Sequence, residues 1–284
     1  MKEPSVGVLV LAAGKGTRMK SGLPKVLHPI LDRPMLGYLL ETSASCGFAA
    51  VAAVVGYEGK QVCDYLRSRF PSAETIRQEE QLGTGHAVRI SRPWWERFDN
   101  VLVLNGDLPL LRSETLRSLF EFHRGAACSM LSFVTDHPDG YGRILRSRGG
   151  IAIVEHGDAT PEQRLVREAN AGCYLFDTEA LSRVIGRLNN ENAQGEYYLP
   201  DAVNLMSGAG MEIRALPAEE EELAGVNTQA ELAAATARVR DFIVQKWMSA
   251  GVYVMDPSAV WIGPDALLAP DVRLMPGVQI WGDS

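Results

Sequence analysis

The first half of this 284-residue sequence alternates continuous apolar runs with helical patterns, and this alternation restricts the fold most strongly. The apolar runs are "VGVLVLAA", "AAVAAVVGY", "NVLVLNGD" and "ACSMLSFVT", which span residues 6–13, 49–57, 100–107 and 127–135. Helical patterns follow the first three runs, near residues 35–46, 59–69 and 113–123. Strands without polar alternation are typical of a parallel sheet that helices cover on both faces. We therefore predict an α/β fold around a mixed, mostly parallel sheet.

Shorter strand candidates follow, and they predict a mixed insertion beside the main sheet. They are "RILRS", "GIAIVEH", "AGCYLF" and "MEIRALP", which begin at residues 143, 150, 171 and 211. A long helix is expected over residues 228–250, because apolar side chains recur there at spacings of three and four. The side chains in question are Leu232, Val239, Phe242, Ile243 and Trp247.

The last part of the chain has a six-residue period. Small or branched apolar residues recur in two series, Val254, Val260, Ala266, Val272 and Val278, and Ile262, Leu268, Leu274 and Ile280. Two agreeing series favour a parallel β-helix over chance. Such repeats cannot bury their apolar faces alone, so either a longer chain or another subunit would cover them. We expect three parts: a main domain over 1–227, a linker helix over 228–250, and the start of a β-helix over 251–284.

The composition excludes several classes of protein. The net charge of −7 argues against general nucleic-acid binding, which needs a basic face. No segment approaches the roughly 18 apolar residues of a membrane span. The four cysteines are scattered without a C-x-x-C pair, which indicates free thiols in a reducing compartment such as the cytoplasm. The histidines form no cluster with zinc-site spacing.

A glycine-rich, basic loop follows the first apolar run. The stretch "LAAGKGTRMKSGLPKVL", residues 11–27, matches neither the dinucleotide fingerprint nor the G-K-[ST] of a P-loop. Gly14 and Gly16 let backbone N–H groups approach an anion, and Arg18 and Lys25 add positive charge. Ligands dock beyond the carboxyl ends of strands in such sheets, so the loop suits a triphosphate. The alternative is a surface turn with solvated basic residues.

Further polar residues allow two interpretations each. Asp107 ends an apolar strand, where a carboxylate is either a helix-entry cap or a metal ligand. Asn227 is either the N-cap region of the long helix or a ligand. Gln78 and Gln81 are either exposed loop residues or part of a pocket in which an amide donates and accepts at once.

The order of motifs resembles a known family. "LAAGKGTRMKSGLPKVLH" is similar to the signature of sugar-1-phosphate nucleotidyltransferases, and more closely to the N-terminal half of the bifunctional N-acetylglucosamine-1-phosphate uridyltransferase/glucosamine-1-phosphate acetyltransferase family. The segments "RQEEQLGTGHAV", "GDLPLL", "GYGRI", "IVEH", "NAG", "NAQGEYYLPD" and "GVN" follow in the family's order. The resemblance covers about residues 5–250 and implies a Rossmann-like nucleotidyltransferase followed by a short stub of left-handed β-helix.

The resemblance also implies a role for particular residues. Arg18 and Lys25 would be catalytic, and Asp107 and Asn227 would hold Mg²⁺. Gly142, Glu155 and Asn170 would line the sugar site. The nucleotide would meet Leu11, Ala12, Ala13, Gly14, Gln78, Gln81, Gly83, Thr84, Asn105 and Gly106.

The implied reaction transfers a uridylyl group from UTP to N-acetylglucosamine 1-phosphate, for peptidoglycan and lipopolysaccharide precursors. The family's trimer depends mainly on the β-helix, so the resemblance leaves open whether this chain forms a homotrimer. The family's acetyltransferase residues lie beyond this sequence, so no acetyl transfer is expected from it. Ala171 and Pro200 depart from the family pattern near the sugar site, which leaves another sugar 1-phosphate open. Two rival functions are a non-catalytic scaffold that binds a sugar nucleotide and a cytidylyltransferase.

Overall fold

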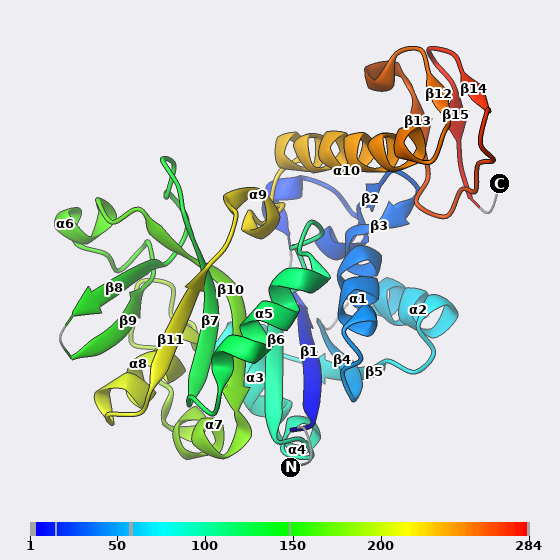
Figure 1. Ribbon diagram of the computed structural model, residues 1–284. Helices are drawn as coiled ribbons and strands as arrows, with labels where there is room; N and C mark the ends of the chain where they lie inside the picture. The colour runs from blue at the N-terminus through cyan, green and yellow to red at the C-terminus, as the bar shows by residue number, and fades with distance from the viewer. Residues whose placement is uncertain (1–3, 15, 57–58, 148, 283–284) are drawn as a thin grey trace.

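The computed structural model describes residues 4–14, 16–56, 59–147 and 149–282, and within them nine strands form the main sheet (Figure 1). Seven strands lie side by side in the order β11-β7-β10-β6-β1-β4-β5, and β8 pairs with β10 and β9 at one side. Within this order β10 is antiparallel to β6 and β7, and the other neighbouring pairs are parallel, whereas the pairs that β8 makes are antiparallel. The predicted α/β fold with a mixed, mostly parallel sheet is confirmed. The nine strands are β1 Val6–Ala12, β4 Ala50–Gly56, β5 Glu74–Gln78, β6 Asn100–Asn105, β7 Cys128–Val134, β8 Arg143–Ser147, β9 Gly150–Val154, β10 Glu168–Asp177 and β11 Ile213–Pro217.

Helices cover both faces of this sheet and bury its central strands β1, β6, β7 and β10 almost completely. Val8 and Val10 of β1 face one apolar core, and Leu9 between them faces another. All three are fully buried, which explains why β1 shows no polar alternation. The first core includes α1 Met35–Ser45, α2 Lys60–Arg69, α5 Ser113–His123 and α9 Glu220–Leu223. The second includes α3 Thr84–Ile90, α4 Arg92–Trp95, α7 Thr178–Val184 and α8 Pro200–Gly208.

The sequence interpretation was wrong about β10. Residues 140–227 were expected to lie beside the main sheet, but β10 lies inside it, between β6 and β7. Its residues from Ala169 to Phe176 are all buried, because both faces are covered by helices and both edges are paired. β11 also belongs to the main sheet, where it pairs with β7. Of this part of the chain, the hairpin of β8 and β9 projects away from the sheet (Figure 1).

The predicted long helix is α10, Gln229–Ser249. It begins with a capping box, in which the Thr228 hydroxyl accepts from the Glu231 N–H and the Glu231 carboxylate accepts from the Thr228 N–H. The predicted apolar stripe is buried except for Phe242, which is 73% exposed. Consecutive residues of an α-helix point about 100° apart, and Phe242 lies at the edge of the buried face, where its side chain turns to solvent.

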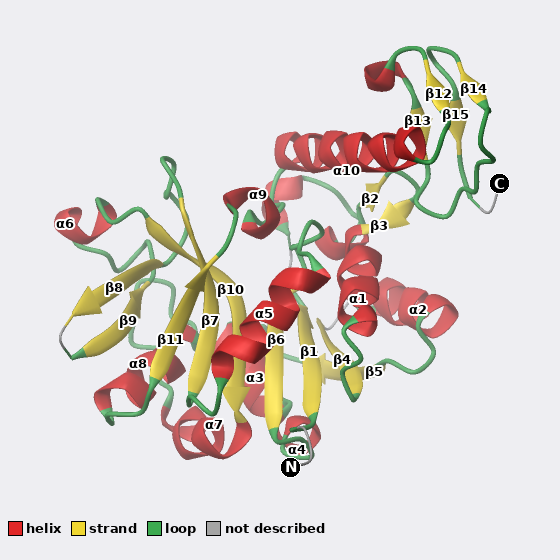
Figure 2. Cartoon of the chain, in the orientation of Figure 1, coloured by secondary structure: helices red, strands yellow, loops and turns green. Residues whose placement is uncertain are grey.

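The C-terminal residues form two small parallel pairs of strands at the far end of α10 (Figure 2). β12 Tyr253–Val254 pairs with β14 Arg273–Leu274, and β13 Trp261–Ile262 pairs with β15 Gln279–Ile280. Paired residues of β13 and β15 are three six-residue repeats apart along the chain. Val254, Val260, Ile262, Ala266 and Leu274 of the two periodic series pack against α10 in a third apolar core.

The remaining elements are short. They are β2 Pro29–Ile30, β3 Arg33–Pro34, α6 Pro161–Arg164 and the 3₁₀ turns η1 Thr17–Met19, η2 Lys25–Leu27, η3 Ile185–Arg187 and η4 Pro257–Ala259. None of the described helices has the length and apolar character that crossing a membrane requires.

Candidate nucleotide and sugar phosphate site

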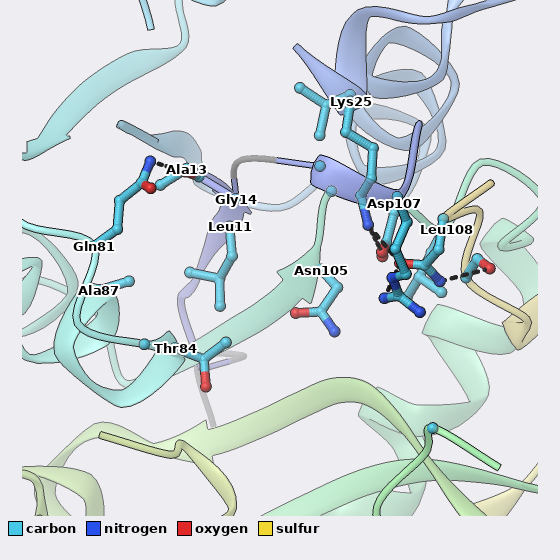
Figure 3. Close-up of a pocket in the computed structure, with 18 of the residues that line it drawn as sticks. Leu11, Ala13, Gly14, Lys25, Gln81, Thr84, Ala87, Asn105, Asp107 and Leu108 are labelled. Carbon is cyan, nitrogen blue, oxygen red and sulfur yellow. Dashed lines mark hydrogen bonds and ion pairs between the residues drawn. The ribbon is translucent and has the colours of Figure 1, made fainter. Parts of the chain in front are cut away.

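A cavity of about 620 Å³ opens at the carboxyl ends of β1 and β6 (Figure 3). These strands are parallel neighbours, so the loops that follow them meet at one edge of the sheet. Lys25 and Asp107 lie at one end of the view, and Gln81 and Thr84 lie at the other. The predicted residues that line this cavity are Leu11, Ala13, Gly14, Arg18, Lys25, Gln78, Gln81, Gly83, Thr84, Asn105, Gly106, Asp107, Asn170 and Asn227.

The described residues of the basic loop are held by contacts with the rest of the chain, and Lys15 lies outside the described residues. Gly16 has a φ of +60°, and a Cβ at this position would lie 2.6 Å from the Lys25 Cβ. Glycine is therefore required here both for its conformation and for the space. Met19 is buried beneath α10, and its carbonyl accepts a hydrogen bond from the Gln229 side chain at 3.2 Å. The loop is not a solvated surface turn.

Two cationic and two oxygen-bearing side chains meet at one end of the cavity. The Lys25 ammonium forms an ion pair with the Asp107 carboxylate and donates to the Asn227 Oδ1 at 2.8 Å. Arg18 donates to the same Asn227 oxygen, also at 2.8 Å. The side chains of Lys25 and Asp107 are each only 16% exposed. Such a cluster places positive charge and oxygen ligands within reach of a polyphosphate.

The Asn227 oxygen is aimed at this cluster by the backbone. Its Nδ2 donates to the Gly225 carbonyl at 3.1 Å, which turns Oδ1 toward the cations. The N–H of Val226 donates to the Asp107 carbonyl at 3.0 Å and joins the two segments. Asp107 is therefore not a cap of α5, because its carboxylate points to Lys25.

The donor set fits a hard divalent cation. A carboxylate oxygen of Asp107 and the amide oxygen of Asn227 already converge on one positive charge, the Lys25 ammonium. Mg²⁺ takes oxygen ligands, and in nucleotide sites it takes one or two from protein and the rest from phosphate and water. The residues present thus suit a cation that shares its ligands with a bound phosphate.

The other end of the cavity carries amide side chains held by backbone carbonyls. The buried Gln78 donates through Nε2 to the Gly83 carbonyl at 3.2 Å, and Gln81 donates through Nε2 to the Ala13 carbonyl. Gly56 makes room for Gln81, since a Cβ on Gly56 would lie 2.5 Å from the Gln81 Nε2 and 3.0 Å from the Ala13 oxygen. These bonds fix the amide groups before any ligand arrives.

The segment 82–85 is joined to residues 197–199 and forms a wall of the cavity. The N–H of Tyr197 donates to the Leu82 carbonyl at 2.8 Å, and the N–H of Gly85 donates to the Tyr197 carbonyl at 2.7 Å. The Thr84 hydroxyl accepts from the Leu199 N–H at 3.1 Å. Gly83 has a φ of +101°, and a Cβ there would lie 2.7 Å from the Tyr197 oxygen, so no larger residue fits.

A bulge in β10 shapes the side of the site near Asn170. The pairing of β10 with β7 shifts between Asn170 and Tyr174. The Asn170 amide then donates to the Tyr174 hydroxyl at 2.6 Å and accepts from the Gly172 N–H at 3.2 Å. Gly172 has a φ of +70° and packs under the Asn105 side chain, where a Cβ would lie 2.9 Å from the Asn105 Cγ.

Glu155 and Gly142 line a smaller adjoining cavity of about 150 Å³, which shares Thr84, Asn105 and Asn170 with the first. Burial, and after it the carboxylates of Asp201 and Asp158, raise the pKa of Glu155 to about 7, against the opposing effect of Arg143. A Cβ on Gly142 would lie 3.2 Å from the Glu155 Oε1. The Glu155 carboxyl thus faces a concave, polar space beside the larger cavity.

Sequence reasoning placed most of the site but missed some residues. Ala12 was expected among the nucleotide contacts, but it is buried in β1 and is not one of the residues that line either cavity. Gly56, Gly172 and Tyr141 were missed, although the first two leave space for site side chains and the third lines both cavities. The run "GYGRI" was noted, but nothing in it marks the tyrosine as the residue that faces the ligand space.

Comparison with known proteins agrees with this geometry. Residues 8–171 match the family described as MobA-like NTP transferase domain. The chain belongs to this family. It is 43% identical over 290 residues to the bifunctional protein GlmU of Clavibacter sepedonicus, a match that covers 100% of this chain and 59% of that protein. It is also 44% identical to the bifunctional protein GlmU of Pelobacter propionicus, over 98% of this chain and 62% of that protein.

The relationship predicted from the motifs is confirmed by these matches, and the chain spans about 60% of the length of these relatives. A solved structure of a UDP-glucose pyrophosphorylase with UDP-glucose is similar in fold, with a TM-score of 0.66. That match covers 83% of this chain and 98% of the other at 17% identity. The Rossmann-like nucleotidyltransferase fold is thereby confirmed.

Proposed function

We propose that the chain transfers a uridylyl group from UTP to N-acetylglucosamine 1-phosphate, with UDP-N-acetylglucosamine and pyrophosphate as products. The observation that carries this proposal is the cluster of Arg18, Lys25, Asp107 and Asn227 at one end of a cavity whose other end has fixed amide groups. A charged end suits a triphosphate, and a hydrogen-bonding end suits a base. The whole-chain similarity to bifunctional GlmU proteins supports the same reaction.

The reaction needs no covalent intermediate on the protein. An oxygen of the sugar phosphate attacks the α-phosphorus of UTP, a new P–O bond forms, and the bond to the β-phosphate oxygen breaks as pyrophosphate leaves. The attacking phosphate is already ionised near neutral pH, so the site needs no general base. What it must overcome is repulsion between an anionic nucleophile and a polyanion.

The residues of the charged end lower this repulsion because they place positive charge beside the phosphates. Lys25 and Arg18 would neutralise phosphate oxygens, and the side chains are held by Asp107, Asn227 and the Gly16 contact. Asp107 and Asn227 would hold Mg²⁺, which supplies further positive charge to the phosphates when it is bound. Arg18 and Lys25 already lie at this end of the cavity in the free protein, and a cation on Asp107 and Asn227 would replace the Lys25 ammonium there and free it to bind phosphate.

The sugar would occupy the side of Asn170, Glu155 and Gly142. The Glu155 carboxylate would accept hydrogen bonds from sugar hydroxyls, and the Asn170 amide would meet a hydroxyl or an acetamido group. Pro200 lines the same smaller cavity and has neither a hydroxyl nor a backbone N–H to offer. This favours a second candidate, a uridylyltransferase for another sugar 1-phosphate.

A panel of sugar 1-phosphates distinguishes the candidates. Pyrophosphate release is measured with UTP and Mg²⁺ held constant and the glucose, N-acetylglucosamine, galactose and mannose 1-phosphates compared. Highest kcat/KM with N-acetylglucosamine 1-phosphate supports the proposal, and a clear preference for another sugar supports the second candidate. If no sugar 1-phosphate gives pyrophosphate release, the result supports the rival function, a non-catalytic scaffold that binds a sugar nucleotide.

We also propose that residues 251–284 begin a left-handed β-helix, with 228–250 as its linker. The parallel pairs β12–β14 and β13–β15 support this, because one turn of the chain separates the paired strands. Tyr253, Met255, Leu267 and Met275 of this region are large exposed apolar residues, which further subunits in a homotrimer would cover. Light scattering of the purified chain tests the trimer. The free cysteines agree with a cytoplasmic location.

A further inference from the structure

His86 of α3 contacts the buried Gln78 side chain at the amide end of the cavity. The Gln78 Nε2 lies 3.1 Å from the His86 Nδ1 and 3.2 Å from the Gly83 carbonyl oxygen. The side chain of Gln78 is only 3% exposed and lines the cavity. His86 itself does not line the larger cavity, so it acts on a ligand only through Gln78.

The carbonyl of Gly83 decides which way the Gln78 amide points. A carbonyl oxygen can only accept, so the atom that faces it must be the NH₂ group. The second hydrogen of that NH₂ group then faces the His86 Nδ1, which must accept it. His86 is therefore neutral, with its proton on Nε2. In the described part of the chain, both contacts of this amide go through Nε2, which leaves Oε1 for a ligand.

The surroundings of His86 favour this neutral form. Burial lowers its pKa below the ordinary value, the Arg89 guanidinium lowers it further, and the backbone and carboxylate of Glu80 act in the opposite direction. Arg89 is held over the Tyr197 ring at 4.4 Å, and the His86 and Tyr197 rings are 6.3 Å apart. The imidazole is thus fixed between α3 and the wall segment that contains Tyr197.

We propose that His86 is a positioning residue for base selection. It holds the Gln78 side chain so that Oε1, an acceptor, faces the base and neither N–H of the amide is free to donate to it. This inference rests on the proposed function, in which Gln78 meets the pyrimidine edge. Uracil has an N–H group at N3, which can donate a hydrogen bond to the Gln78 Oε1. Cytosine has a lone pair at N3, which the lone pairs of Oε1 repel. Turning the Gln78 amide to suit cytosine would place Oε1 against the Gly83 carbonyl oxygen. The donor that uracil O4 needs must then come from a group other than Gln78.

The test compares the affinities of UTP and CTP by calorimetry in the wild type, His86→Leu and His86→Asn. Leucine removes one of the two acceptors that hold the Gln78 NH₂ group, and asparagine keeps an acceptor through its side-chain oxygen. We expect the ratio of UTP to CTP affinity to fall about tenfold in His86→Leu and to stay within about twofold of wild type in His86→Asn. The ratio cancels the shared triphosphate contacts, and His86→Phe replaces the leucine variant if thermal melting shows it to be unfolded.

Two results would contradict the role of His86, and a third would contradict the proposed uridine specificity. A full UTP preference in the leucine or phenylalanine variant excludes His86 as the positioning residue, and so does an equal loss in the asparagine variant. Equal binding of UTP and CTP by the wild type instead contradicts the proposed uridine specificity, on which this inference depends. Failure of the inference and failure of the proposed function are thus separated by the wild-type measurement.

Discussion

Substitution of Gly172 by alanine tests how the bulge in β10 shapes the site. Gly172 has a φ of +70°, a conformation that costs a residue with a Cβ about 1–2 kcal/mol. The new Cβ would also lie 2.9 Å from the Asn105 Cγ, and the Asn105 amide nitrogen is closer still. Overpacking of this kind costs a further ~1–3 kcal/mol. We therefore expect Gly172→Ala to lower the free energy of unfolding by about 2–5 kcal/mol.

Gly47, just after α1, provides a matched control. Its φ is +73°, and a Cβ there would meet nothing within 4 Å, so Gly47→Ala carries only the conformational cost. The difference between the two variants isolates the overlap with Asn105. Adding Asn105→Ala to Gly172→Ala removes that overlap and should restore stability to about the level of Gly47→Ala.

Thermal melting measures these differences, because each kcal/mol shifts the Tm of a chain of this size by about 2–4 °C. We expect Gly172→Ala to melt below Gly47→Ala, and its KM for the sugar 1-phosphate to rise more than its KM for UTP, since Asn170 lies two residues away. Equal Tm values for the two single variants would refute the steric argument. A double variant no more stable than Gly172→Ala would refute the role of Asn105.

Three further predictions concern the charged groups of the site. Lys25→Ala should lower kcat by about 10²–10³ because it removes a phosphate contact, and near-normal turnover of the folded variant in a steady-state assay would exclude Lys25 from the mechanism. Asp107→Asn should raise the Mg²⁺ concentration for half-maximal rate by about tenfold or more, and an unchanged metal titration would indicate a different ligand. Burial and the carboxylates of Asp201 and Asp158 raise the pKa of Glu155 from 4.5 to about 7 in the folded protein. Between these two pH values folding takes up a proton, so the free energy of unfolding falls as the pH rises toward 7. Glu155→Gln lacks this loss, so its Tm relative to wild type should increase from pH 5 to pH 8, and a pH-independent difference would contradict the raised pKa.

Most of the main sheet could be predicted because its buried strands are local signals, whereas the mostly exposed β5 gives no apolar run and was not predicted. Strands β1, β4, β6 and β7 are buried on both faces and therefore appear in the sequence as continuous apolar runs. The place of β10 could not be predicted in this way, because strand order depends on partners distant in the sequence. An apolar run reports that a strand is buried, but it does not report which strands lie beside it.

The same distinction, between local signals and contacts with distant parts of the sequence, applies to the site residues. The residues that carry chemistry, such as Lys25 and Asp107, stand in recognisable motifs at the carboxyl ends of strands. Gly56 and Gly172 are required for another reason, because a side chain from elsewhere in the chain occupies the space beside each of them. Neither the sequence around a glycine nor its period identifies that neighbour. His86 was missed for the same reason, since its effect passes through a contact with Gln78.

The long helix belongs to the site as much as the sheet does, although the sequence suggests a linker. Its entry supplies Asn227, whose oxygen accepts from Arg18 at 2.8 Å, and its first residue, Gln229, donates to the Met19 carbonyl at 3.2 Å. Met19 in turn packs into the apolar core formed with α10. A basic loop with glycines would not hold one shape by itself, because glycine gains the most freedom when it is unfolded. The apolar face of α10 therefore helps to hold the cationic loop beside Asp107, and it does so before any phosphate is bound.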